Sequence, residues 1–141
     1  MRDVQAPKPG ALAVVGACLA AVVLLAQNHP ATPHRHPEGQ KLKNPVASTP
    51  ASITAGSKMF AKFCMTCHGA MGKGDGSGAP EGSHPANFTD AIWQHGSSDG
   101  EVYMTIHDGI GPDYFMDSWE GKIPDQEIWN LVNYVKSLSK K

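Results

Sequence analysis

The 141-residue chain has only three cysteines, and just two of them, Cys64 and Cys67, are close in sequence. A structural zinc site usually draws on a second cysteine pair, which this chain lacks, so zinc would also need two distant histidines. A thioredoxin-like redox pair normally follows a strand, and nothing before Cys64 has the pattern of a buried strand. Both explanations of the cysteine pair are therefore disfavoured.

Alternation of apolar and polar residues, the pattern of a half-buried strand, is also absent over any useful length after Ile53. Apolar residues instead recur at helical spacing in two segments, 55–63 and the stretch that follows Ile123 and Pro124. Asp125 or Glu127 would favour the N-terminus of the second helix. The spacing therefore predicts an all-α domain over residues 53–141. The apolar stripes consist of Met59, Phe60 and Phe63 in the first segment, and of Ile128, Leu131, Val132, Val135 and Leu138 in the second.

Charged residues are missing from Ala11 to Ala26, a run of sixteen residues that follows Arg2 and Lys8. As a helix it would span about 24 Å, against a hydrocarbon core of about 30 Å. Residues 1–27 are therefore predicted to be a signal peptide or a membrane anchor. Leu24 occupies a position where signal peptidase prefers a small residue, so we favour the anchor. Val15 to Cys18 resembles a lipoprotein box, which leaves a lipid on Cys18 as a third alternative.

Large apolar residues are scarce in the next segment, which carries five prolines between Asn28 and Ala51. A segment with so few apolar side chains is not expected to fold by itself. Residues 28–52 are therefore predicted to be a disordered, flexible linker that lets a tethered domain swing between partners. Its histidines, His29, His34 and His36, are more simply explained as solvated side chains than as metal ligands.

The most informative residues present are Cys64-Met65-Thr66-Cys67-His68, a CxxCH motif. In this motif two thiols each bond one vinyl group of a porphyrin, and the adjacent imidazole becomes an axial ligand of the iron. The motif predicts one covalently bound haem c, with Cys64 and Cys67 as attachment points and His68 as the proximal ligand. The domain should therefore carry electrons.

Residues 53–138 resemble the class I c-type cytochromes, the small bacterial mono-haem domains. The resemblance rests on Gly56 and Phe60 before the motif, on the glycine-rich stretch 69–82, and on Leu131 with Tyr134 in the last helix. It implies a fold of short helices wrapped around one haem, in which the first and last helices cross at the glycine. It also implies that the carbonyl group of Pro80 accepts a hydrogen bond from the imidazole of His68.

The family's sixth ligand is typically a methionine before the last helix, and Met116 lies in that place. Asp117 follows it where the family usually has proline, which predicts a softer loop and a weaker bond to iron. His107, with His95 behind it, is the alternative ligand and would lower the reduction potential. Trp119 is a candidate hydrogen-bond donor to a haem propionate. The residues expected to line the haem crevice or support it are Phe88, Ile92, Val102, Tyr103 and Ile106. Trp93 and Trp129 are expected either to donate hydrogen bonds to haem propionates or to fill the core.

An excess of positive charge is absent as well, since residues 52–141 carry seven Lys or Arg and eleven Asp or Glu, a balance of −4. Nucleic acid is therefore disfavoured as a partner, and a protein with a basic patch is favoured. We expect a one-electron carrier, not an enzyme, on the periplasmic side, either anchored or exported. Its partners would be a membrane oxidase, a quinol-oxidising complex or a dehydrogenase. A haem-based sensor, a peroxidase-like enzyme and a fixed subunit of a larger membrane complex are the alternatives.

Overall fold

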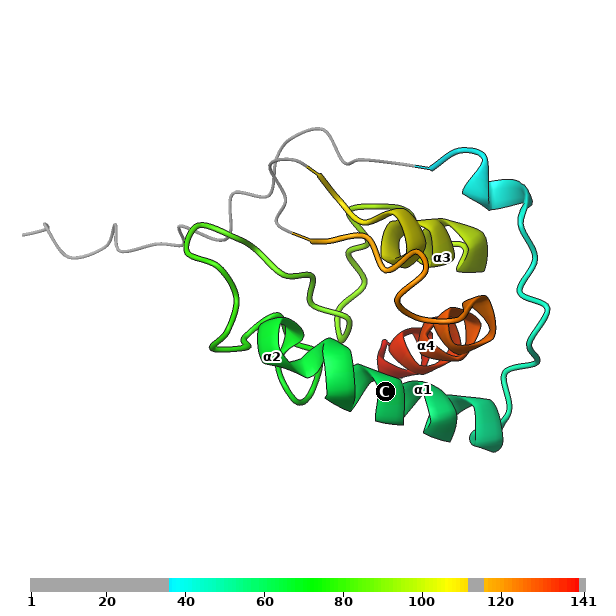
Figure 1. Ribbon diagram of the computed structural model, residues 1–141, viewed down its shortest axis with the longest axis horizontal. Coiled ribbons are helices and arrows are strands. Elements are labelled where there is room, and N and C mark those ends of the chain that lie inside the picture. Colours follow the sequence, from blue (N-terminus) through cyan, green and yellow to red (C-terminus); the bar gives the residue numbers. More distant parts are fainter. Residues whose placement is uncertain (1–35, 112–115, 140–141) are drawn as a thin grey trace, which may run out of the picture.

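The computed structural model describes residues 36–111 and 116–139, and within them four α-helices surround one apolar core. In chain order the elements are a short 3-10 helix η1 (Gly39–Lys41), α1 (Pro50–Phe63), α2 (Met65–His68), α3 (Asp99–Asp108) and α4 (Asp125–Leu138). The described residues form no strand, and their single β-bridge joins Ile110 to Met116. The predicted all-α fold is confirmed (Figure 1).

The first helix begins earlier than the predicted segment 55–63 because a capping box precedes it. The hydroxyl group of Thr49 accepts a hydrogen bond from the backbone N–H of Ser52, whose own hydroxyl accepts one from the N–H of Thr49. Pro50 occupies the first turn, where its missing N–H costs nothing. Helix α1 therefore starts at Pro50 and runs without interruption to the haem-binding motif.

Helices α1 and α4 pack directly against each other, as the resemblance to class I c-type cytochromes implies. A Cβ atom on Gly56 would lie 2.1 Å from the backbone oxygen of Asn130 and 2.8 Å from the Cβ of Tyr134. Only glycine permits so close an approach of the two backbones. Beside this crossing the rings of Phe60 and Tyr134 lie 5.2 Å apart, and Leu131 is 1% exposed. Both crossing helices therefore contribute residues to the hydrophobic core.

The segment 36–49 differs from the predicted linker, because it packs on the helices instead of remaining free. It runs along the edge of the molecule from a position beside α3 to the start of α1 (Figure 1). A Cβ on Gly100 of α3 would meet the backbone oxygen of Gly39 at 2.0 Å, and the ring of His36 is buried. Polar and backbone contacts hold this segment, which a count of apolar residues does not detect. We call residues 36–49 the N-terminal strap.

The predicted signal peptide or anchor (1–27), including Cys18, and the first part of the predicted linker lie outside the described residues. Within the described part of the chain, no helix is long and apolar enough to cross a membrane.

Candidate haem site

The CxxCH motif lies at the end of α1, where the chain turns into α2. Phe60 and Phe63 anchor this end of α1 against the core, and Cys64 ends that helix. The loop that follows folds back over α2, because the N–H groups of Gly74, Gly76 and Gly78 donate to the carbonyl groups of His68, Cys67 and Thr66. A Cβ on Gly76 would lie 2.3 Å from the oxygen of Thr66. The glycines thus let the loop hold the motif through its backbone.

A cavity of about 500 Å³ opens beside this motif. Among the described residues, its walls come from the α1–α2 junction, the loop 80–96, one side of α3, the segment after α3 and Val135 of α4. Most of the lining is apolar or aromatic, which suits a flat hydrophobic ligand. The predicted lining residues Phe88, Ile92, Val102 and Ile106 all contribute, whereas Tyr103 does not.

The two motif cysteines are not joined by a disulfide, and both line this cavity. Burial, and after it the neighbouring Cys67, raises the pKa of Cys64 to about 12, so its thiol is protonated. The sulfur of Cys67 lies 3.5 Å from the carbonyl oxygen of Gly78. Among the described residues, no group of three or more His, Cys, Asp or Glu could hold a metal ion. Two thiols at the edge of an apolar cavity fit attachment to two porphyrin vinyl groups.

The imidazole of His68 lines the same cavity, and its Nδ1 lies 3.2 Å from the carbonyl oxygen of Ala86. A carbonyl oxygen can only accept, so Nδ1 carries the proton and the lone pair of Nε2 is available to iron. Burial lowers the pKa of this histidine, although the bond to Ala86 opposes the shift. A neutral imidazole with one defined tautomer is what an axial ligand requires.

The bond to Ala86 corrects the expectation for Pro80. The Pro80 carbonyl instead accepts hydrogen bonds from the N–H and hydroxyl groups of Ser83, at 3.0 and 2.6 Å. Loop 80–83 is thus a local turn, and the chain reaches the imidazole only six residues later. Pro80 still lines the cavity. No local sequence pattern identifies Ala86, because its role depends on how the loop 69–85 returns to α2.

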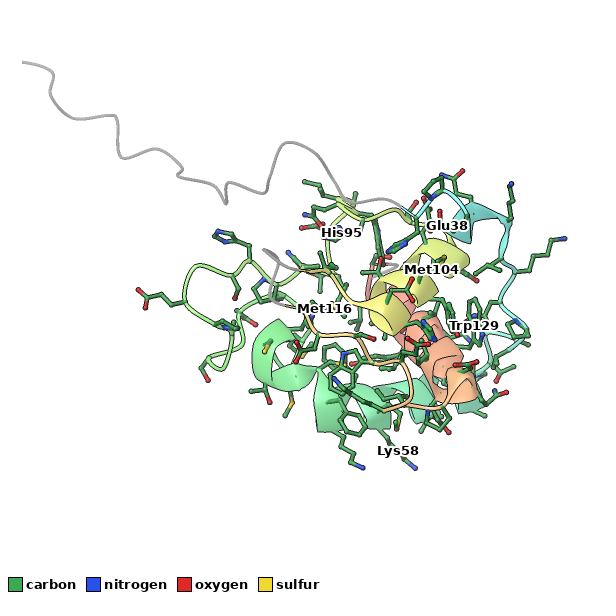
Figure 2. The ribbon with its side chains drawn as sticks, turned by 45° about the horizontal axis from the view of Figure 1, so that its top comes forward. Glu38, Lys58, His95, Met104, Met116 and Trp129 are labelled. Atoms are coloured by element: carbon green, nitrogen blue, oxygen red, sulfur yellow. The ribbon has the colours of Figure 1, made fainter. Side chains whose placement is uncertain are left out.

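Met116 lies in the segment after α3 and lines the cavity together with the motif (Figure 2). Its backbone oxygen accepts a bond of 2.8 Å from the N–H of Ile110. Gly109, with φ +75°, ends α3 and allows this close return, since a Cβ there would lie 2.7 Å from the oxygen of Met116. Asp117 also borders the cavity. The structure therefore brings Met116 into the same cavity as His68, Cys64 and Cys67.

His107, the alternative sixth ligand, lies outside the described lining of the cavity. Its ring stacks on Tyr103 with centroids 5.4 Å apart, and its Nδ1 lies 2.5 Å from a carboxylate oxygen of Asp108. His95 does line the cavity. Of the tryptophans, Trp119 and Trp93 line it, whereas Trp129 stacks on Tyr103 at 4.1 Å in the core.

Fold and site together define a small all-α domain whose apolar cavity, beside the CxxCH motif, fits one covalent haem and is lined by both His68 and Met116. A family model described as "Cytochrome c" matches residues 53–139, and the chain belongs to this family. Haem c, attached covalently and holding iron, is its cofactor.

Among curated proteins, the chain is 39% identical over 84 residues to the cbb3-type cytochrome c oxidase subunit FixP of a Bradyrhizobium species, covering 60% of this chain and 27% of that protein. It is 34% identical over 96 residues to the corresponding subunit CcoP of Rhodobacter capsulatus, covering 62% and 30%. The chain thus spans less than a third of the length of these relatives.

Among solved structures, the chain resembles part of the Kuenenia stuttgartiensis reducing HAO-like protein complex, with a TM-score of 0.61 and 32% identity over 69% of this chain and 49% of that one. Cytochrome cL of Methylophaga aminisulfidivorans shares the fold, with a TM-score of 0.53 and 22% identity over 64% of this chain and 57% of that chain.

Proposed function

We propose that this protein carries single electrons through its haem c, with His68 and Met116 as the axial ligands of the iron. The observation that carries the proposal is that Met116, His68 and both attachment cysteines line one cavity, although Met116 lies far along the chain from the motif. When bound, haem supplies an iron that alternates between Fe(II) and Fe(III). The protein residues hold the cofactor, exclude water with an apolar lining and present one neutral imidazole.

The decisive experiment compares the full chain with its Met116→Ala variant, both produced with a haem-attachment system. Oxidised wild-type protein should show a low-spin, six-coordinate spectrum with the weak far-red band of methionine bound to Fe(III). Met116→Ala should lose that band. Met104→Ala is the matched control, because Met104 lies on α3 outside the described lining of the cavity (Figure 2). A variant spectrum identical to that of the wild type would refute the assignment.

The same samples separate an electron carrier from a haem-based sensor or peroxidase-like enzyme. Asp117 beside the cavity, in place of a proline, is the feature that favours the second candidate. A firm bond between Met116 and iron should make carbon monoxide binding slow in the Fe(II) state. Rapid binding by the wild-type protein would favour an open or readily vacated distal position.

We further propose that the domain works outside the cytoplasm, where bacteria attach haem to CxxCH motifs, as part of a membrane oxidase. Its relatives FixP and CcoP are named as oxidase subunits, which supports a fixed subunit over a free shuttle. The N-terminal strap supports the same choice. Only residues 28–35 separate the predicted anchor from the packed chain, and eight extended residues span at most about 29 Å. A tether of that length keeps the haem close to the membrane surface.

The proposed redox partner presents a basic patch, because the acidic balance of residues 52–141 favours cations. Small oxidants test the charge that an approaching partner meets. As salt is added, we expect oxidation of the Fe(II) protein by a cationic cobalt(III) complex to become slower. Oxidation by anionic ferricyanide should become faster. The opposite salt dependence would point to a basic docking face.

A further inference from the structure

The side chain of Phe88 lies flat against the imidazole of His68. Their ring centroids are 4.7 Å apart and the planes are inclined by only 26°. Phe60 is farther from the same imidazole, at 6.4 Å, and is tilted by 51°. Stacked rings at this separation attract each other and resist tilting. Phe88 is therefore the aromatic residue that covers a face of the imidazole.

Phe88 is itself held firmly by its own surroundings. Its backbone N–H donates a bond of 2.7 Å to the carbonyl oxygen of Gly72. Its ring meets the ring of Phe60 edge-on, with centroids 6.3 Å apart, and lies 6.3 Å from that of Trp93. A Cβ on Gly72 would come within 3.3 Å of the phenyl ring. These contacts with neighbouring protein groups hold the ring of Phe88 in place.

We infer that Phe88 is a positioning residue that fixes the rotation of the His68 imidazole plane. The carbonyl of Ala86 secures Nδ1, but a hydrogen bond of 3.2 Å tolerates a broad range of angles at the acceptor. The phenyl ring of Phe88, stacked on one face of the imidazole, blocks rotation of the imidazole plane towards the phenyl ring. The inference rests on the proposed ligation of iron by His68. The orientation of an axial ligand tunes the electronic state of haem iron, so the stack bears on the reduction potential.

The test replaces Phe88 by leucine in the full chain and records the electron paramagnetic resonance spectrum of the Fe(III) protein. We expect Phe88→Leu to shift and broaden the principal g values while the visible spectrum stays six-coordinate. Phe88→Tyr keeps the ring and should restore the wild-type g values. Phe63→Leu is the matched control, because Phe63 also lines the cavity but packs against Trp119. Unchanged g values in a six-coordinate Phe88→Leu protein would overturn the inference.

A second measurement needs no substitution and stands even if Phe88→Leu does not take up haem. In the diamagnetic Fe(II) state of the wild-type protein, nuclear Overhauser contacts should connect the ring protons of Phe88 to those of His68. Their absence would show that the rings are not stacked in the loaded protein. Failure of the axial assignment itself would appear in the wild-type visible spectrum, before any Phe88 variant is compared.

Discussion

The side-chain oxygen of Asn133 on α4 accepts a hydrogen bond of 2.9 Å from Nδ2 of Asn44, a residue 89 positions earlier in the chain. The Nδ2 of Asn133 donates to the carbonyl oxygens of Val46 and Ala47 and to the hydroxyl of Ser52. The Asn133 side chain is buried. One amide therefore joins α4 both to the N-terminal strap and to the first turn of α1.

Replacing Asn133 by alanine should release the strap and destabilise the domain. We expect a loss of about 1–3 kcal/mol in the free energy of unfolding, because the bonded strap groups lose a buried partner. Denaturant unfolding measures this loss, and proteolysis should become faster within residues 36–49. Asn130→Ala is the control, because Asn130 is similarly buried on α4 but bonds only within its helix, to Glu127. Equal losses in the two variants would contradict a special role for Asn133.

Gly56→Ala should force α1 and α4 apart. The new Cβ would lie 2.1 Å from a backbone oxygen of Asn130, and a backbone cannot move aside as a flexible side chain can. We expect the free energy of unfolding of the haem-bound protein to fall by about 1–3 kcal/mol, measured by thermal unfolding. The yield of attached haem should also be lower. Gly111→Ala is the comparison, since a Cβ there would meet no atom of the described residues within 4 Å. A Gly56→Ala protein that melts like the wild type would show that the helices tolerate a wider separation.

Helices α1 and α4 were predictable because their signals are local and periodic, whereas their crossing was an implication of the resemblance to class I c-type cytochromes. The stripe from Ile128 to Leu138 repeats at helical spacing, and Gly56 with Phe60 occupies the matching place on α1. The start of α1 was predicted too late, since Thr49 and Pro50 act through a cap and not through an apolar stripe. The strap was missed for a related reason. Its contacts are long-range amide bonds and a backbone approach between Gly39 and Gly100, neither of which leaves an apolar signature.

The residues of the site likewise fall into two groups, those that the sequence identifies and those that only the fold reveals. Cys64, Cys67 and His68 are fixed by covalent spacing within five residues, so sequence alone identifies them. The partner of His68 is not local, because Ala86 is 18 positions away and reaches the imidazole only after the loop folds back. Nothing distinguishes an alanine carbonyl from that of Pro80 until the path of the chain is known. The stack of Phe88 on His68 is likewise a property of that path.

Acid should remove the contribution of Glu101 to stability. Burial tends to raise the pKa of this carboxyl, but hydrogen bonds from Gln40 and Ser98 outweigh it, and the pKa is lowered. Because the folded pKa lies below the unfolded value of about 4.3, the stabilisation is present above that pH. It is lost as the pH falls through the folded pKa.

The variant Glu101→Gln tests this linkage. It should unfold more easily than the wild type at pH 7, by about 1–3 kcal/mol, and the gap should narrow as the pH is lowered to about 3. Glu120→Gln removes the same charge from an exposed position and should follow the wild type throughout. A gap between Glu101→Gln and the wild type that stays constant with pH would mean that the carboxylate charge contributes nothing.

The position of Met116 depends on a residue that never reaches the cavity. Gly109 has φ +75°, a conformation that L side chains rarely adopt, and a Cβ there would lie 2.5 Å from the backbone nitrogen of Ser118 and 2.7 Å from the oxygen of Met116. An added methyl group must therefore displace residues 116–118. Gly109→Ala should weaken the far-red band of methionine-bound Fe(III) and speed carbon monoxide binding by Fe(II), while the far-ultraviolet circular dichroism stays that of the wild type.

Gly111→Ala serves as the neighbouring control, because a Cβ at that position would contact none of the described residues within 4 Å. It should retain both the far-red band and slow carbon monoxide binding. If Gly109→Ala also retains them, the backbone return at Gly109 is not what places the methionine. If both variants lose them, the cause is a general sensitivity of the loop to added side chains. The close approach between residues 109 and 116 is identified as what brings Met116 to the haem only if the far-red band and slow carbon monoxide binding are lost in Gly109→Ala alone.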